Sequence, residues 1–378
     1  MNAGNFNKSG RRKRVLVSPL DWGLGHATRC IPIIRELISN DCEVILAAEA
    51  AGMHLLQLEF PQLEALELKG YHIKYRIGRK GFHLKIILQI PKIFRTIWLE
   101  HRWLKKTVLE KGIDLIISDN RFGLYHSSVP CIYVTHQLTI KTGNSFTERI
   151  IQRLHYHFIH KYSACWVPDA AGEQNLAGEL SHPARMPKTP VHYIGPLSRF
   201  EKYPADKKYD LAIILSGPEP QRTVFEDRLL SELAQYKGFC IFIRGLPGNS
   251  KTKKTGNPNI EIHDHLPAFE LNKAILQSTL VISRSGYTTV MDLVKLQQQA
   301  LLIPTPGQSE QEYLGRYLSG CRYFYKNEQE DFSLSSIEYL NTLPLPTLPQ
   351  FPEQFKQVIH HITIISPPQT EVPSVKSH

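Results

Sequence analysis

The sequence predicts an α/β protein made of two parallel-sheet domains. Short apolar runs suited to strands alternate with longer segments of helical periodicity along most of the 378 residues. This alternation is typical of parallel sheets whose strands are joined by right-handed helical crossovers. The chain is also too long for one ordinary hydrophobic core, and it suits two domains of roughly 150 to 200 residues each.

The N-terminal half is expected to form one domain over residues 1–197. Its first strand is followed by a turn that contains Gly23, Gly25 and His26, and a helix is expected over residues 27–39. Further helical segments separate several of the later strands. The expected strands cover residues 14–19, 42–48, 63–68, 114–118, 131–136, 164–168 and 191–197.

A polar segment over residues 198–209 separates the two halves and is predicted to be an interdomain linker. A second domain is expected over residues 210–345. Residues 346–378 are rich in proline, and we expect a helix at residues 354–365 followed by a disordered tail. The expected strands of the second domain cover residues 210–215, 239–244, 260–263, 280–283 and 300–303.

The composition is that of a globular protein, with 42% hydrophobic and 21% charged residues. No apolar run approaches the ~18 residues that a membrane-spanning helix needs, so a soluble cytoplasmic protein is expected. Six cysteines are scattered without metal-ligand or redox spacing, and the chain has no Asp-x-Asp pair. Neither a disulfide framework nor a metal cofactor is therefore expected.

Positive charge is concentrated in one segment. The net charge is +10, and between Lys69 and Lys111 twelve lysines and arginines accompany only two acids. From Pro91, which begins a helix more readily than it sits inside one, apolar residues including Trp98 recur at helical spacing. Such a helix suits peripheral contact with an anionic membrane on its inner face. Alternatively, its apolar stripe packs on the sheet and its lysines are solvated. No nucleic-acid-binding module accompanies the charge, so no nucleic-acid partner is expected.

Two glycine-containing turns at strand ends suit a phosphorylated ligand. A helix start carries unsatisfied amide donors and a partial positive charge, and a glycine before it lets a phosphate approach the backbone. Gly286 precedes such a helix start, and Gly25 lies after the first strand. Open parallel sheets bind ligands at this edge, although either glycine also serves simply to close a turn.

The runs RSGYTTVMD at residues 284–292 and PTPGQSEQ at residues 304–311 resemble the C-terminal signature of family-28 glycosyltransferases. The turn that ends in His26 is similar to the glycine-rich loop that opens the N-terminal domain of these enzymes. The resemblance implies the GT-B fold, in which two Rossmann-like, doubly wound domains face each other across a cleft. It also implies inverting transfer of a sugar, here an N-acetylhexosamine, from a UDP-sugar to a saccharide or lipid-linked acceptor.

The resemblance also implies roles for individual residues. His26 is the expected catalytic base because a neutral imidazole accepts a hydroxyl proton near pH 7, and Asp119 is its substitute. His136 is expected on the acceptor side. Arg284 either neutralises the donor diphosphate or braces its turn from behind. The expected donor-binding residues are Gly25, Ser216, Gly217, Arg222, Leu266, Phe269, Arg284, Ser285, Gly286, Thr288, Asp292, Gln308 and Gln311.

Within the donor-binding set, Asp292 is expected to hold the ribose hydroxyls, in place of the glutamate that the family usually has. Leu266 and Phe269 are expected to flank the uracil ring, and Gln311 to contact the sugar. Two other functions are compatible with the same motifs. One is a non-hydrolysing UDP-sugar 2-epimerase, and the other is a non-catalytic nucleotide-sugar-binding protein.

Overall fold

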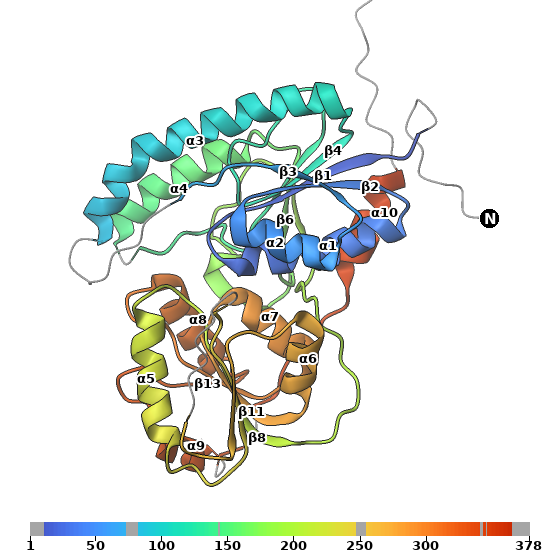
Figure 1. Ribbon diagram of the computed structural model, residues 1–378. Coiled ribbons are helices and arrows are strands. Elements are labelled where there is room, and N and C mark those ends of the chain that lie inside the picture. Colours follow the sequence, from blue (N-terminus) through green and yellow to red (C-terminus); the bar gives the residue numbers. More distant parts are fainter. Residues whose placement is uncertain are drawn as a thin grey trace, which may run out of the picture.

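The computed structural model describes residues 11–72, 82–142, 144–246, 255–340, 343–344 and 346–364. Within these ranges the chain forms two all-parallel sheets, each with helices on both faces (Figure 1). The predicted fold class is therefore confirmed. The first sheet has the strand order β3-β2-β1-β4-β5-β6-β7 and the second has the order β10-β9-β8-β11-β12-β13.

The first sheet occupies the N-terminal half, and its strands confirm the predicted ones to within a few residues. They are β1 (Arg14–Pro19), β2 (Glu43–Ala48), β3 (Glu64–Glu67), β4 (Leu115–Asp119), β5 (Cys131–Val134), β6 (Ala164–Val167) and β7 (Val191–Tyr193). The helices are α1 (Leu24–Ser39), α2 (Ala50–Glu59), α3 (Phe82–Lys111) and α4 (Ser145–Ile159), with a short η1 turn (Gly178–Leu180).

The second sheet begins at Tyr209, the last residue of the segment predicted as the linker. Its strands are β8 (Tyr209–Ile214), β9 (Cys240–Ile243), β10 (Ile260–His263), β11 (Ser278–Ser283), β12 (Ala300–Leu302) and β13 (Tyr325–Lys326). The helices are α5 (Gln221–Leu233), α6 (Ala268–Leu276), α7 (Tyr287–Leu296), α8 (Ser309–Gly320) and α9 (Leu334–Leu340). The last helix, α10 (Gln354–Ile364), returns to the first domain and packs against α1 (Figure 1).

Side chains that alternate along β1 separate two cores on the two faces of the first sheet. Val15 and Val17 pack in the core under α1 and α10, whereas Leu16 packs with Leu104 of α3. Successive residues of a strand point to opposite faces, so a strand that is apolar throughout requires helices on both sides. The core under α1 continues through α7 into the second domain, where it includes Val290.

Two predicted helix starts are wrong. The helix expected from Pro91 begins nine residues earlier, at Phe82, and contains Pro91. Proline removes one backbone hydrogen bond, and Pro91 lies on an exposed part of the helix, where water can satisfy the freed carbonyl. The first helix begins at Leu24 rather than Ala27, after Gly23 adopts a φ of 96° that favours glycine. His26 therefore lies in the first turn of α1.

A buried ion pair fastens α3 to the carboxyl edge of the first sheet. The Arg121 guanidinium lies 2.9 Å from Glu100 Oε1 of α3 and donates to the carbonyls of Pro19, Leu68 and Lys69. The other Glu100 oxygen accepts from the Tyr71 hydroxyl at 2.8 Å. Burial raises the pKa of Glu100 to about 7, although Arg121 opposes the rise.

Replacing Arg121 by leucine removes the donors of three strand-end carbonyls and the partner of a buried acid. We expect Arg121→Leu to lower the free energy of unfolding of the N-terminal domain by about 3–5 kcal/mol. A urea titration followed by circular dichroism measures the change. Lys106→Ala, which breaks the exposed pair with Glu110, is the matched control and should cost less than about 1 kcal/mol. Equal losses for the two variants would contradict the prediction.

Candidate active site

The candidate site lies where both sheets reverse their strand order. In the first sheet β1 lies between β2 and β4, and in the second β8 lies between β9 and β11. Ligands of open α/β sheets bind at the carboxyl ends of the strands that flank such a reversal. His26 follows β1 and Asp119 ends β4, while Ser216 follows β8 and Ser285 follows β11. The strand topology thus places predicted residues of both domains at equivalent positions.

His26 and Asp119 are brought together by the pairing of β1 with β4, which sets Pro19 opposite Asp119. The Nδ1 atom of His26 lies 3.2 Å from Asp119 Oδ1. The His26 side chain is 15% exposed, whereas the Asp119 side chain is fully buried. Burial and the neighbouring Arg29 lower the pKa of His26, and Asp119 opposes them, so the neutral imidazole is favoured near pH 7.

Arg29, which was not predicted as a site residue, is the partner of the Asp119 carboxylate. Its Nε donates to Asp119 Oδ2 at 2.5 Å and its Nη2 donates to Oδ1. Burial alone would raise the pKa of Asp119, but Arg29 and His26 outweigh it and lower the pKa to about 2. Because both oxygens of Asp119 are engaged and none of the side chain is exposed, the geometry favours His26 over Asp119 as the base.

His136 connects the two domains at the centre of the site. It follows β5 and is buried, and its Nε2 lies 2.8 Å from Glu310 Oε1 in the first turn of α8. Its Nδ1 lies 3.1 Å from Arg29 Nη1. The His136 ring stacks on Tyr287 of α7 with centroids 4.2 Å apart, and the Tyr287 hydroxyl donates to the carbonyl of Pro168 at 2.8 Å.

The glycine-rich turn of the first domain touches the start of α7 in the second. Thr288 Oγ1 donates to the carbonyl of Gly25 at 3.2 Å. A Cβ atom at Gly25 would lie 3.0 Å from that same Oγ1 atom, so glycine permits the close approach. Ser309 at the start of α8 likewise donates to the carbonyl of Lys141 at 2.8 Å. The N-termini of α7 and α8 therefore contact the first domain at the carboxyl edge of its sheet.

Farther along α8, two tyrosines dock on the η1 region. The Tyr313 hydroxyl accepts from the Glu179 amide at 2.7 Å, and the Tyr317 hydroxyl donates to Asn175 Oδ1 at 2.8 Å. Gly178 has a φ of 52°, and a Cβ atom there would lie 2.5 Å from the Tyr313 hydroxyl. A side chain at this position would therefore clash with the docked helix.

The two predicted turns of the donor half contact each other. Ser285 Oγ donates to the carbonyl of Gln311 at 2.8 Å, and the Gln311 side chain accepts from the Thr305 amide at 2.9 Å and contacts Gln308. Gly286 is the N-cap of α7 and provides no side-chain cap, so the first amides of that helix lack a capping acceptor from it. These amides are suited to an anion.

The two predicted donor-site arginines are engaged by other groups of the second domain. Arg284 is fully buried, lies over the ring of Phe225 at 4.4 Å and donates to Gln329 Oε1 and to backbone carbonyls that include that of Ile303. Of its two predicted roles, the geometry favours bracing the turn. Arg222 is buried in an ion pair with Glu226 at 2.6 Å.

The remaining donor-half residues are spread around the second domain. Ser216 and Gly217 are exposed in the turn after β8, where Gly217 has a φ of 110°. Leu266 is half-buried just before α6, and Phe269 is 68% exposed on that helix. The contacts of these side chains with a base or phosphate stay predictions.

Asp292, the expected ribose ligand, contacts the linker segment. Its Oδ1 accepts from Ser198 Oγ at 2.5 Å, and the residue is only 8% exposed. Burial raises the pKa of Asp292 to about 6, against the opposing effects of Arg199 and Ser198. Ribose contact would require Asp292 to exchange this partner.

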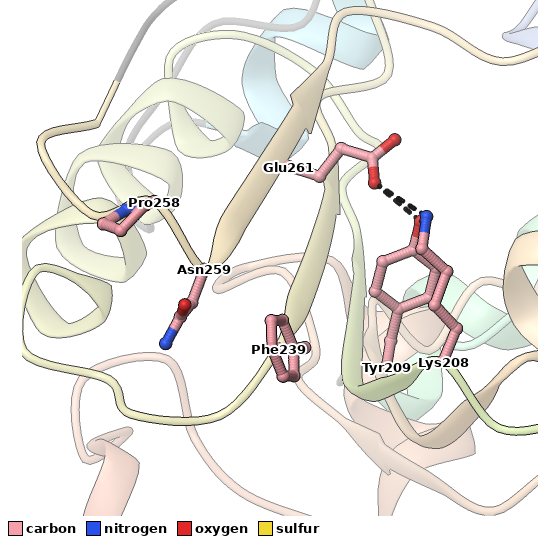
Figure 2. Close-up of a pocket in the computed structure, with 6 residues that line it drawn as sticks. All are labelled: Lys208, Tyr209, Phe239, Pro258, Asn259 and Glu261. Carbon is pink, nitrogen blue, oxygen red and sulfur yellow. Dashed lines mark hydrogen bonds and ion pairs between the residues drawn. The ribbon is translucent and has the colours of Figure 1, made fainter.

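A shallow pocket in the second domain lies away from the site (Figure 2). Its residues come from the beginnings of β8, β9 and β10, which form the edge opposite to the one just described. The Tyr209 hydroxyl donates to Glu261 at 2.6 Å across it. The lining residues are Lys208, Tyr209, Phe239, Pro258, Asn259 and Glu261.

The comparisons with known proteins agree with this arrangement. Residues 245–351 match the C-terminal domain of glycosyltransferase family 28. A curated relative from Glaesserella parasuis, named UDP-N-acetylglucosamine--N-acetylmuramyl-(pentapeptide) pyrophosphoryl-undecaprenol N-acetylglucosamine transferase, is 25% identical over 342 residues, covering 86% of this chain and 88% of the relative. The chain is a glycosyltransferase that resembles family 28. The family match begins after β9. For the N-terminal half of this glycosyltransferase, the similarity comes from relatives that match over most of the chain.

Solved glycosyltransferase structures share the fold of this enzyme. The kitacinnamycin glycotransferase matches with a TM-score of 0.63 at 12% identity, covering 94% of this chain and 95% of that one. Acinetobacter baumannii MurG matches with a TM-score of 0.51 at 13% identity, covering 93% and 94% of the two chains. At these identities the likeness shows the GT-B fold of the glycosyltransferase and not its substrates.

Neither a metal site nor a membrane span is found in the described part of this glycosyltransferase. No cluster of three or more His, Cys, Asp and Glu side chains there is arranged to hold a metal ion. No described helix is both long and apolar enough to cross a bilayer. Independence from metal stays a prediction.

The raised pKa of Asp292 predicts a pH-dependent cost of folding. Between about pH 3.8 and 6 the carboxyl ionises in the unfolded chain but keeps its proton in the folded enzyme, so stability falls across that window. Asp292→Asn removes this cost, and we expect a gain of up to about 3 kcal/mol above pH 7 that vanishes near pH 4.

Chemical denaturation of the wild type and of Asp292→Asn at several pH values measures the difference. Asp331→Asn, at an exposed acid, is the control for an aspartate-to-asparagine change outside the site. Parallel pH profiles for wild type and Asp292→Asn would contradict the prediction.

Proposed function

We propose that this enzyme transfers an N-acetylhexosamine from a UDP-sugar to an acceptor hydroxyl by an inverting displacement that needs no metal. The contact between Gly25 and Thr288 carries the proposal, because it joins the turn before His26 to the start of α7. The proposed base, His26, and the proposed anion-binding start of α7 therefore lie close to each other. The Glaesserella parasuis relative, whose name gives UDP-N-acetylglucosamine and an undecaprenol-linked acceptor, supports this choice of donor and a lipid-linked acceptor.

The chemistry divides between the two domains. The acceptor oxygen attacks the anomeric carbon as the bond from that carbon to the diphosphate oxygen breaks, and the acceptor proton passes to His26. The departing diphosphate gains negative charge, which the amides at the start of α7, near Gly286, stabilise. Asp119 holds His26 in place from behind. The partial positive charge of the helix start takes the part that a metal ion has in other transferases.

A donor screen with a base variant tests the proposal. UDP and UDP-N-acetylglucosamine should raise the melting temperature of the wild type more than UDP-glucose, GDP-mannose or dTDP-sugars do. His26→Gln should keep the shift with UDP and lose transfer by about 10²–10⁴-fold. His157→Gln, at an exposed position of α4, is the matched control and should retain activity.

Three results would overturn the proposal. The first is failure of every uridine nucleotide to stabilise the fold. The second is conversion of UDP-N-acetylglucosamine without an acceptor, which would indicate a 2-epimerase. The third is loss of transfer on adding a chelator, which would show that the reaction needs a metal ion.

We also propose that α3 and α4, which lie side by side (Figure 1), dock this enzyme on an anionic membrane at the inner face of the cell. Trp98 of α3 is 57% exposed with the Arg102 guanidinium 5.4 Å above its ring. Phe146 and Ile150 of α4 are 68% and 52% exposed. Arginines and lysines interleave with these apolar side chains, as in interfacial helices. The exposed lysines and arginines among the described side chains of these helices are Lys92, Arg95, Arg102, Lys105, Lys106, Arg149 and Arg153.

The sequence predicted only the α3 half of this surface. Between Lys69 and Lys111, residues 73–81 and the side chains of residues 82–88 lie outside the described residues. Ile97, Leu104 and Val108 pack on the domain, as the second alternative for the basic helix predicted, whereas Trp98 is exposed. Membrane contact itself stays a proposal.

Replacing one exposed apolar residue on each helix by an acid tests membrane docking. Trp98→Glu combined with Ile150→Glu should lower binding to vesicles of phosphatidylglycerol and phosphatidylcholine at least about tenfold, because both hydrophobic and electrostatic attraction decrease. Sedimentation with vesicles measures the bound fraction. Leu58→Glu, at an exposed leucine of α2, is the control. Unchanged binding of the double variant, or no binding by the wild type, would refute docking through this surface.

A further inference from the structure

The Arg29 guanidinium contacts His26 and His136, in each case at the Nδ1 atom of the ring. Its Nη2 lies 2.8 Å from His26 Nδ1, and its Nη1 lies 3.1 Å from His136 Nδ1. A guanidinium has only donors. A neutral imidazole has one donor and one acceptor nitrogen, and the partner of one nitrogen decides the state of the other.

We propose that Arg29 is a positioning residue that fixes the ring tautomer of both histidines, so that His26 carries its proton on Nε2 in the enzyme without substrates. The consequence for catalysis rests on the proposed function, in which His26 is the base. The assignment of the two tautomers does not depend on that function.

His136 shows the tautomer without ambiguity. With Arg29 donating to its Nδ1, its Nε2 must carry the proton, and Nε2 lies 2.8 Å from Glu310 Oε1, an acceptor. Both ring nitrogens are therefore satisfied by one tautomer. The opposite tautomer would direct two donors at each other on the Arg29 side and leave Glu310 facing a lone pair.

At His26 two groups compete for Nδ1. Arg29 Nη2 approaches it at 2.8 Å and Asp119 Oδ1 at 3.2 Å. The Asp119 oxygens already accept from Arg29 at both positions. The shorter contact and the occupied carboxylate both favour donation by Arg29, which leaves the His26 proton on Nε2.

A proton on Nε2 makes His26 a donor and not a base. For His26 to accept the acceptor proton at Nε2, its Nδ1 must change partner from Arg29 to Asp119. In that exchange Nε2 gives one proton to water and Nδ1 takes one proton from water, so the charge of the ring and of its neighbours is unchanged. Arg29 thereby sets how readily the base becomes available.

Nuclear magnetic resonance of the full chain with ¹⁵N-labelled histidine tests the proposal directly. Long-range ¹H–¹⁵N correlations distinguish the two tautomers of each ring, and His26→Gln and His136→Gln assign the signals. We expect the Nε2–H form for both residues in the wild type without substrates. An Nδ1–H form of His26 in the wild type would overturn the proposal, and this measurement requires no variant of Arg29 to fold.

Arg29→Met provides the second measurement. Removing the guanidinium donors should convert neutral His26 to the Nδ1–H form bonded to Asp119, and the signals of Arg35→Lys, on the same helix, should match those of the wild type. An unchanged His26 tautomer in folded Arg29→Met would refute the role of Arg29.

The pH profile of transfer gives a third readout. His26 faces Arg29 of α1, Asp119 of β4, His136 and Glu310, and the Cys30 thiol contacts Asp119. Removing the cation from this set raises the pKa of His26, so the acidic limb of the Arg29→Met profile should move to higher pH by about one unit or more. An unmoved limb would count against the proposal. If no donor supports transfer in the wild type, the proposed function fails while the tautomers still decide the role of Arg29.

Discussion

The bidentate pair between Arg29 and Asp119 is the contact on which the centre of this enzyme depends. Asp119 ends a central strand and has no exposed surface, and an unpaired carboxylate there would be very costly. Arg29 neutralises it from the adjacent helix and at the same time reaches His26 and His136. Helix α1, the first sheet and the cleft histidines are therefore held in one geometry by a single side chain.

Much of the fold follows from local patterns. Apolar runs such as Val15–Val17 and Val281–Ile282 are bounded by polar turns, and the parallel sheets follow from their alternation with helices. The strand β13 was not predicted, because two residues carry too little pattern. The predicted helix starts too late, at Pro91. The preference of proline for a helix start outweighed the amphipathic pattern in the sequence, which continues on both sides of Pro91.

The site was harder to predict because its contacts join distant parts of the chain. His26, Asp119 and His136 were found as polar residues at strand ends, where parallel sheets gather their functional groups. Arg29 was missed, although it lies three residues after His26, one helical turn away. Nothing local to Asp292 indicates Ser198 as its partner, and nothing in residues 284–292 distinguishes an arginine that faces a ligand from one that lies behind the turn.

Helix α8 contacts the first domain at four points along its length, from Ser309 and Glu310 to Tyr313 and Tyr317. Because these side chains belong to one helix, any motion that carries α8 away from the first domain as a unit breaks all four contacts. The placement of the second domain is thus coupled to the surroundings of His136, whose Nε2 partner Glu310 lies on that helix.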